Sequence, residues 1–399
     1  SRLMEKRSTW ESHWQECADY MQPRKAEITK ERARGDKRNI QIFDATAIHA
    51  LELLASSLQG MLTSSANRWF AMRYKEALLN ESDEAKEWLE DATDKMYLAF
   101  GRSNFQQEIF ETYHDLITFG TSCLMIEEDE NDIVRFSSRH IKEFYVEENK
   151  KGIVETVYRR FKMPVAAAID KFGLENFSRD TANLFKKEPF EELELVHVVR
   201  PRSIYDENKL DKKNMPFQSI YFEYGSGHII NIGGFKEMPY VVPRYLKAST
   251  EIYGRSPAMN ALPDGSRDRI EPLNIGQQTS VTLNQENQRR EAIAKTFHID
   301  QLLVTANRTM TATEVLQRNE EKMRILGPAL ARMQQELLQP MILRVFNIML
   351  RNKQFLQAPE ILANQEVDIE YVSPMALAQK GQELQSLMRG LELFGQIGQ

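Results

Sequence analysis

The hydrophobic pattern of this chain changes its period twice, and this constrains the fold more than any other feature of the sequence. Apolar residues recur at helical spacing up to Gly120, alternate with period two from Cys123 to about Lys247, and return to helical spacing after Pro257. A helical part, a β-rich part and a second helical part therefore follow one another along the chain. We predict an α+β fold that is mainly helical.

Three helices are predicted in the first part of the chain. One spans residues 44–62, with Asp44 placed to cap its first turn, and a second starts near Ser82. In the third, Asn104 and Gln107 resemble a capping box, and the glycine at 120 can end the helix. Each helix carries an apolar stripe that is expected to face inward.

Three β-hairpins are predicted in the middle of the chain, each formed by two short alternating segments around a polar or glycine-containing turn. A short helix at 165–172 and a charged connector at 185–192 interrupt them. The paired segments are 123–127 with 133–137, 144–146 with 153–160, and 217–224 with 228–232.

A long helix is predicted from about residue 311 to residue 352, on the order of 60 Å at 1.5 Å per residue. Gly327, Pro328 and Pro340 interrupt it. Because proline removes a backbone donor and clashes with the preceding turn, we expect bends at these points rather than one straight rod. A final helix is predicted to start at Ser373.

The composition limits the class of protein. With 42% hydrophobic and 28% charged residues the chain can bury hydrophobic cores, and no apolar run is long enough to span a membrane. A net charge of -6 argues against tight binding of nucleic acid over most of the surface, so any DNA contact should be loose or local. Cys17 and Cys123 have no partner at metal-ligand spacing and are expected to be lone buried thiols.

No motif for catalysis or cofactor binding stands out. The seven histidines are scattered, and the glycine pairs lack the ending of a phosphate-binding loop. The acidic run at 127–132 could bind a divalent cation or hold nuclease metals, but a solvated hairpin tip is the favoured interpretation. Loss of magnesium-dependent DNA cleavage on changing Glu128 and Asp129 to alanine would support the nuclease. We expect no catalytic site, metal or cofactor.

A group of basic residues invites two interpretations, a surface that faces DNA and an ordinary charged helix face. Glu271, Glu286 and Glu291 lie among them, so the sequence leaves both open. The basic residues are Arg267, Arg269, Arg289, Arg290 and Lys295.

Two stretches of the chain are similar to one known family. The first runs through PYVVPRY at 239–245 and YGRSPA at 253–258, and the second through MTATEV at 310–315, LGP at 326–328 and ELLQP at 336–340. On these residues the chain resembles the bacteriophage head-to-tail connector, or portal, family of short-tailed phages. Weaker similarities, FDAT at 43–46 and RWF at 68–70, follow the family's order.

The resemblance implies a portal-type architecture with a helical wing, a β-rich wing subdomain, a stem helix, a long bent helix and C-terminal crown helices. It assigns 1–122 to an N-terminal helical wing region, 123–247 to a β-rich wing subdomain, 248–300 to a stem region, 301–310 to a tunnel loop, 311–356 to the long bent wing helix and 357–399 to the start of the crown.

The resemblance also implies roles for individual residues. Asn307 and Arg308 would be the polar members of the tunnel loop that face passing DNA. Residues 279–297 resemble the stem helix that lines the channel, which would place Arg289, Arg290 and Lys295 near its wall or at a subunit contact.

The chain departs from the family in one place. Between ALPD at 261–264 and DRIEPL at 268–273 the family carries a long helix and a clip segment, whereas only Gly265, Ser266 and Arg267 lie there in this sequence. Either the sequence skips a segment between Gly265 and Ser266 or the protein lacks a clip, and the first interpretation is favoured.

The function implied is that of a non-enzymatic portal subunit: a homododecamer ring at a unique capsid vertex, through which double-stranded DNA is packaged and ejected. The expected partners are a terminase motor, a tail adaptor and the major capsid and scaffolding proteins, without membrane. The expected location is the virion, and the host cytoplasm during assembly. The alternative is a capsid or tail adaptor that encloses no DNA.

Overall fold

The computed structural model of the protein describes part of the chain. The described residues are 2–33, 35–38, 42–76, 80, 82–206, 211, 214–243, 279–299, 326–359 and 367–372. They form helices and three antiparallel sheets, which agrees with the predicted α+β class. The final helix predicted from Ser373 lies outside the described residues.

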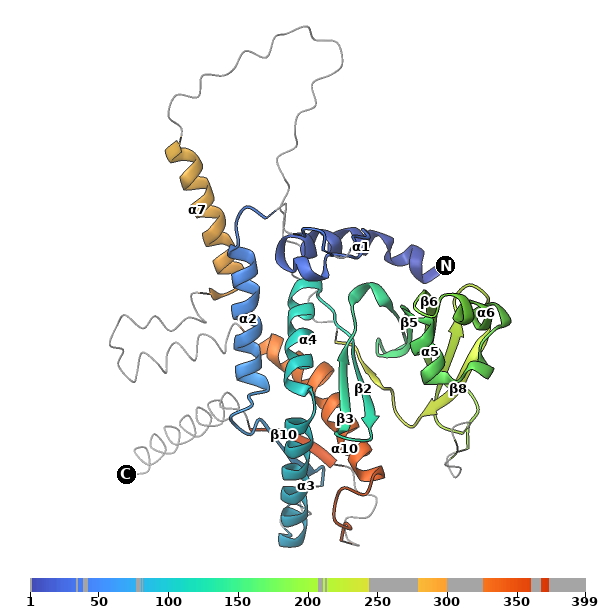
Figure 1. The fold of residues 1–399 in the computed structure, drawn as a ribbon. Helices are drawn as coiled ribbons and strands as arrows, with labels where there is room; N and C mark the ends of the chain where they lie inside the picture. The colour runs from blue at the N-terminus through green and yellow to red at the C-terminus, as the bar shows by residue number, and fades with distance from the viewer. Residues whose placement is uncertain are drawn as a thin grey trace, which may run out of the picture.

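Four helices share one hydrophobic core at the centre of the molecule. They are α2 (Thr46–Leu62), α3 (Asp83–Arg102), α4 (Phe105–Phe119) and α10 (Gln339–Arg351). Figure 1 shows α2 and α4 side by side, and the two helices are in contact. The three helices predicted before residue 120 are confirmed, because an apolar stripe at helical spacing can be buried only against other elements.

The two ends of α4 show one correct and one wrong prediction. Gly120 ends the helix in the left-handed region, at φ 75°, where a Cβ atom would be strained. The capping box at Asn104 is wrong, because its side chain binds the backbone of Phe136 in β3 (Ile133–Ser138) instead. Asn104 Nδ2 donates to the Phe136 carbonyl at 2.9 Å, and Asn104 Oδ1 accepts from the Phe136 N–H at 3.0 Å.

An aromatic cluster fills the core where α3, α4 and β3 meet. Its ring centroids lie 4.6 Å apart for Trp69 and Phe70, 4.6 Å for Phe100 and Phe105, and 5.2 Å for Phe105 and Phe136. Trp69 and Phe70 are almost completely buried, so the Arg-Trp-Phe similarity noted at 68–70 marks core packing.

A two-stranded sheet joins distant parts of the chain. β1 (Phe70–Tyr74) pairs antiparallel with β10 (Val367–Tyr371), with Phe70 opposite Tyr371. Neither strand is among the elements predicted from the sequence. Each is only five residues long and its partner is about three quarters of the chain away, so neither a hairpin turn nor a long alternating pattern indicates the pairing.

The predicted β-hairpins are present. β2 (Leu124–Asp129) pairs with β3, and β9 (Tyr240–Val241) lies on the other side of β2. The other two hairpins belong to a five-stranded antiparallel sheet in the order β4-β5-β6-β7-β8. Its strands are β4 (Phe144–Glu148), β5 (Val154–Pro164), β6 (Glu192–Pro201), β7 (Phe217–Glu223) and β8 (Ile229–Phe235).

The strand β6 occupies the middle of this sheet and was missed. Leu195 and Val199 are buried on one side of it, and Val196 and Val198 are buried on the other. Only residues 192–195 alternate, and the following residues are apolar on both sides, so the pattern that revealed the neighbouring strands is too short here. The helix α6 (Arg179–Lys187) was missed as well, whereas α5 (Val165–Phe172) lies where it was predicted.

The helix α1 (Arg2–Met21) contacts α2 and α4, and its Trp14 shares a core cluster with Phe144 and Val157 of the five-stranded sheet (Figure 1). Trp14 Nε1 donates to the Phe119 carbonyl at the end of α4, at 3.1 Å. Arg7 donates to the Phe144 carbonyl at the start of β4. These two hydrogen bonds connect α1 to the helical core at α4 and to the five-stranded sheet at β4.

A buried histidine also joins two sheets. His197 in β6 is hydrogen-bonded through Nδ1 to the Tyr240 hydroxyl in β9 at 2.8 Å, and through Nε2 to the Ser219 hydroxyl at 2.9 Å. Its ring stacks on Tyr221 with centroids 3.9 Å apart. Burial lowers the pKa of His197 well below its ordinary value, so the ring is neutral and serves as a polar link inside the core.

The helix that contains Pro340 departs from regular geometry. Residues 326–333 are α-helical, a π-helical turn follows at Gln334–Leu338, and α10 begins at Gln339 with Pro340 in its first turn. A proline cannot donate the backbone hydrogen bond of a regular turn, and a widened turn before it relieves the clash. Gly327 and Pro328 lie in the helical residues at 326–333.

Candidate channel helix and buried contact points

The helix α7 (Thr279–Thr296) is the predicted stem helix, and it stands away from the rest of the molecule beyond the end of α2 (Figure 1). Residues 284–292 are exposed on all sides. Phe297, Ile293 and Ile299 anchor the other end in the main core. A helix that is polar all round either stands in solvent between other elements or meets partners outside the chain.

An ion pair ties α7 to the segment before α2. Arg290 Nε donates to Asp44 Oδ2 at 2.8 Å, and Asp44 Oδ1 accepts from the Thr46 N–H at 2.8 Å and from the Thr46 hydroxyl at 2.6 Å. The Thr46 hydrogen bonds, together with Arg290, hold the pKa of Asp44 far below its ordinary value. Asp44 is not the N-cap of α2, which is Ala45, but it joins Thr46, the first residue of the helix, to the distant helix α7.

The three basic residues of α7 have different surroundings. Arg290 is engaged within the subunit by Asp44. Arg289 and Lys295 are exposed, and among the described residues neither forms an ion pair. Arg267, Arg269 and the tunnel-loop residues Asn307 and Arg308 lie outside the described residues, so the structure does not bring the predicted DNA-facing residues together.

Replacing Arg290 with alanine should release the segment before α2. We expect several-fold faster hydrogen exchange of the Thr46 amide and the first turn of α2, because Asp44 then loses the partner that orients it. Hydrogen-exchange mass spectrometry measures this. Arg289→Ala removes the same charge from the next position and should leave the exchange unchanged. Equal effects of the two variants would show that the loss of charge, rather than the ion pair, is responsible.

Two carboxylates of the acidic run have structural roles: one closes a turn and the other forms an ion pair. Asp129 Oδ1 accepts from the N–H groups of Asn131 and Asp132, both at 2.9 Å, and so closes the β2–β3 turn. Glu128 pairs with Arg351 at 3.1 Å. Within the described ranges, no three histidine, cysteine or acidic side chains are grouped so that they could hold a metal ion.

Arg344 is a buried contact point that the sequence analysis missed. Its Nε donates to the Ile126 carbonyl in β2 at 3.1 Å, and its Nη1 donates to the Glu237 carbonyl at 3.3 Å and lies 3.6 Å from the Glu237 carboxylate. Burial lowers the pKa of Arg344 to about 10, so the guanidinium is charged at neutral pH. An arginine inside the otherwise apolar face of α10 is the signal that indicates such a role.

The two cysteines differ in burial. Cys123 is buried and Cys17 is half-buried, and both are free thiols. Burial raises the pKa of each, which makes the thiolate form rarer than in water.

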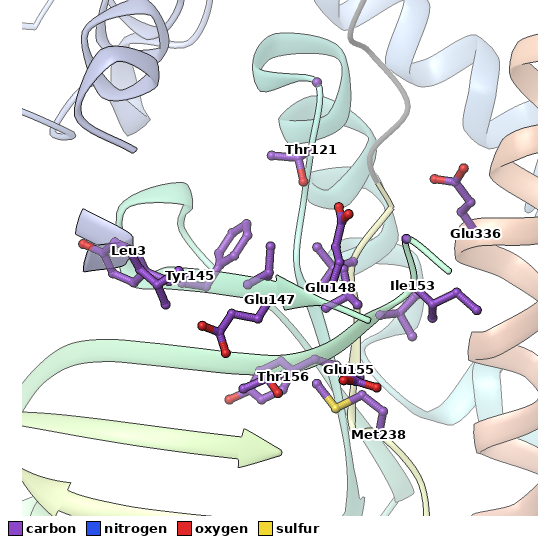
Figure 2. A pocket seen from close by; sticks show the side chains of 18 of the residues that line it. Leu3, Thr121, Tyr145, Glu147, Glu148, Ile153, Glu155, Thr156, Met238 and Glu336 are labelled. Atoms are coloured by element: carbon purple, nitrogen blue, oxygen red, sulfur yellow. The ribbon is translucent and has the colours of Figure 1, made fainter. Parts of the chain in front are cut away.

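A groove of about 1420 Å³ lies between α1, the β4–β5 hairpin and the π-helical turn. Figure 2 shows Tyr145, Thr156 and Glu336 among the side chains that line it. On the α1 side the guanidinium of Arg7 lies 4.1 Å from the centre of the Tyr145 ring, and Trp10 is partly exposed. The lining mixes aromatic side chains with charges of both signs.

None of the helices among the described residues combines the length and the apolar character that crossing a membrane requires.

Comparison with known proteins identifies the family. The sequence matches the family described as bacteriophage head to tail connecting protein over residues 1–267 and 265–399. It is 30% identical over 455 residues to the portal protein of Salmonella phage epsilon15, a match that takes in all of this chain and 82% of the relative. It is also 30% identical over 451 residues to the probable portal protein of Bordetella phage BPP-1, covering 99% of this chain and 81% of the relative.

Proteins that match in this way form a class of structural proteins of the virion. The chain belongs to the bacteriophage head to tail connecting protein family. The two parts of the family match meet at residues 265–267, the place where the sequence analysis found a family segment missing. That junction lies outside the described residues.

Proposed function

We propose that this chain is the portal subunit of a bacteriophage capsid. Copies of it form a ring at one capsid vertex, and the ring is the passage through which double-stranded DNA is packaged and later ejected. The observation that carries this conclusion is the family match, which extends over the whole chain. The relatives that match at 30% identity bear the name portal protein.

The portal contributes geometry and electrostatics rather than chemical catalysis. A separate terminase motor docks on the ring and hydrolyses ATP, while the ring guides the DNA. With a net charge of -6 per copy, a ring of twelve carries roughly -70 in formal charge, so much of the channel repels phosphates. A few basic side chains then form weak contacts with the phosphates, so that the duplex is guided but not tightly bound.

The ring has twelve subunits in this proposal, and α7 is the stem helix that lines the channel. The exposure of residues 284–292 of α7 supports this assignment, because a polar helix surface that is exposed in one subunit can be covered by neighbouring subunits or face the DNA. Arg289 and Lys295 are the cations that α7 offers to DNA or to a neighbour. Asn307 and Arg308 face the DNA from the tunnel loop at 301–310.

The other regions follow the same assignment. Residues 1–122 and 123–247 form the helical and β-rich parts of the wing, 311–356 the bent wing helix, and 357–399 the start of the crown. A tail adaptor binds the outer end of the ring, and the capsid and scaffolding proteins surround it during assembly in the host cytoplasm. The alternative, an adaptor that encloses no DNA, lacks support because the relatives bear the name portal protein.

Native mass spectrometry of the purified chain, with negative-stain images of the same sample, tests the proposal. A closed ring of twelve copies with a central hole is the expected result. A monomer or dimer that persists at every protein and salt concentration, with and without scaffolding protein, would contradict it and favour the adaptor.

A further inference from the structure

The five-stranded sheet has a second apolar face that no described core includes. The strand register places one residue from each strand in a row across the sheet: Tyr145, Tyr158, Val198, Ile220 and Ile232. Because alternate residues of a strand point to opposite faces, and directly paired residues point to the same face, these five side chains share one face. We call it the outer sheet face.

A second row lies beside the first on the same face. Val196 pairs with Arg160 on one side and with Phe222 on the other, and Phe222 pairs with Ile229 of β8. The outer sheet face is therefore apolar at its centre over two neighbouring rows. Arg160 is the one charged member of the second row.

The opposite face of the sheet is packed in the ordinary way. Leu195 and Ile230 belong to a cluster with Ala168 of α5, and Val157 and Val199 belong to a cluster with Trp14 of α1 and other residues. Val196 and Val198 are also buried, at 7% and 6% exposure, but neither belongs to any of the described core clusters.

Such a face is unusual for a sheet that is exposed to water. An antiparallel sheet with one face on the core normally carries polar residues on the other. Here Ile229 and Ile232 are 52% and 51% exposed, and both lie on β8, the edge strand of the sheet. An edge strand with exposed apolar side chains promotes association, so a stable protein has to cover it.

The border of the outer sheet face carries charges of both signs. Arg160 binds Glu194 through two hydrogen bonds of 2.6 and 3.0 Å, and its guanidinium lies 3.8 Å from the centre of the Tyr224 ring. An apolar centre with aromatic residues, bordered by paired charges, is the usual anatomy of a protein interface. Nucleic acid is a poor fit, because a polyanion requires an excess of unpaired positive charge.

We propose that the outer sheet face is a contact between neighbouring subunits of the ring, so that its occupant is a second copy of this chain. The inference rests on the proposed portal function. Contacts in a closed ring are heterologous, and each subunit must bury two unlike surfaces, one on each neighbour. In the assembled ring each subunit always has a neighbour, and that neighbour can cover the exposed edge.

The groove between α1 and the β4–β5 hairpin meets the outer sheet face at the edge strand β4, while Phe144 and Val146 of the opposite face line another part of it. Tyr145 belongs to both, and Thr156 and Glu147, which pair across β4 and β5 on the same face, also line the groove. Figure 2 shows these three residues lining the groove. A projecting element of the neighbouring subunit can therefore enter the groove while a flatter surface covers Ile220 and Ile232.

Site-specific photo-crosslinking tests the proposal on the full chain. A photoreactive p-benzoylphenylalanine in place of Ile232 should yield a covalent dimer of this chain when purified rings are irradiated. The same residue in place of Phe190 is the control, since Phe190 is 84% exposed but lies in the turn before β6 and outside the outer sheet face. It should yield little or no dimer.

A charge substitution provides the second readout. Ile229→Asp combined with Ile232→Asp should lower the fraction of chain in rings at least about tenfold at a fixed concentration, because the interface would then bury unpaired charges. Phe190→Asp should have no effect, and an unchanged circular dichroism spectrum shows that the variants fold.

The outcomes separate the two proposals. Intact rings that give no dimer at Ile232 and that tolerate the double aspartate variant overturn this inference and leave the portal function standing. Crosslinks from Ile232 only to another virion protein overturn the choice of a second copy as occupant. Failure of the unsubstituted chain to form rings counts against the portal function itself.

Discussion

Replacing Arg344 with alanine is expected to lower the free energy of unfolding by about 3–5 kcal/mol, the usual cost of breaking a buried ion pair by removing one partner. The Arg344 guanidinium is almost completely buried, and it joins α10 to β2 and to the segment that contains Glu237. Without it, two backbone carbonyls and the Glu237 carboxylate lose a buried donor. Burial already raises the pKa of Glu237, and Arg344 is the first of the groups that oppose this rise.

Arg351→Ala is the matched control for this prediction. Arg351 belongs to the same helix and pairs with Glu128 at 3.1 Å and with Glu237 at 3.6 Å, but its side chain is partly exposed. A loss of about 0–1 kcal/mol is expected, as for other solvent-accessible ion pairs. Urea unfolding followed by circular dichroism measures both variants. Similar losses for the two arginines would show that burial is not what gives Arg344 its effect.

Replacing Trp69 with alanine should lower the free energy of unfolding by about 3–5 kcal/mol, because the substitution leaves a large cavity in a packed core. Trp69 is almost completely buried, and its ring contacts those of Phe70, Tyr97 and Phe105. The cavity would open beside β1, which is the strand that holds β10. We therefore expect β10 to be lost at a lower urea concentration than α4.

Trp10→Ala is the control for the tryptophan. Trp10 is 42% exposed, and its ring centroid lies 6.2 Å from that of Trp14 in the same helix. Its loss should cost no more than about 1 kcal/mol, since little apolar area leaves the core. Hydrogen exchange reports on β10 and α4 separately during the urea series. A Trp69 variant as stable as the Trp10 variant would mean that the core around β1 collapses into the space.

The helical elements were predictable because their pattern is local. An apolar residue every three to four positions identifies α2, α3 and α4, and Gly120 shows where α4 ends because its left-handed conformation suits glycine. The hairpins β2–β3, β4–β5 and β7–β8 were predictable for a similar reason. Their turns are short, and each has one face on a core.

The elements that escaped prediction depend on distant partners. β6 is apolar on both sides, and β1 meets β10 from the far end of the sequence. Asn104 has the residue type and spacing of a helix cap, but its side chain forms hydrogen bonds with the backbone of Phe136 instead of with the first turn of α4. Local residue spacing cannot indicate a hydrogen-bond partner that lies 32 residues away.

The same division applies to the candidate sites. Residue types and their order were sufficient to identify a portal family member, since a family resemblance is a property of the sequence itself. The position of Arg290 beside Asp44, the burial of Arg344 and the outer sheet face became visible only when the strands and helices were placed in space. The sequence alone determined the helices α2, α3 and α4 and the three hairpins, because backbone preferences and apolar periodicity act over a few residues. The tertiary structure decided which charges are paired and which apolar faces stay uncovered, because those depend on contacts between residues far apart in the chain.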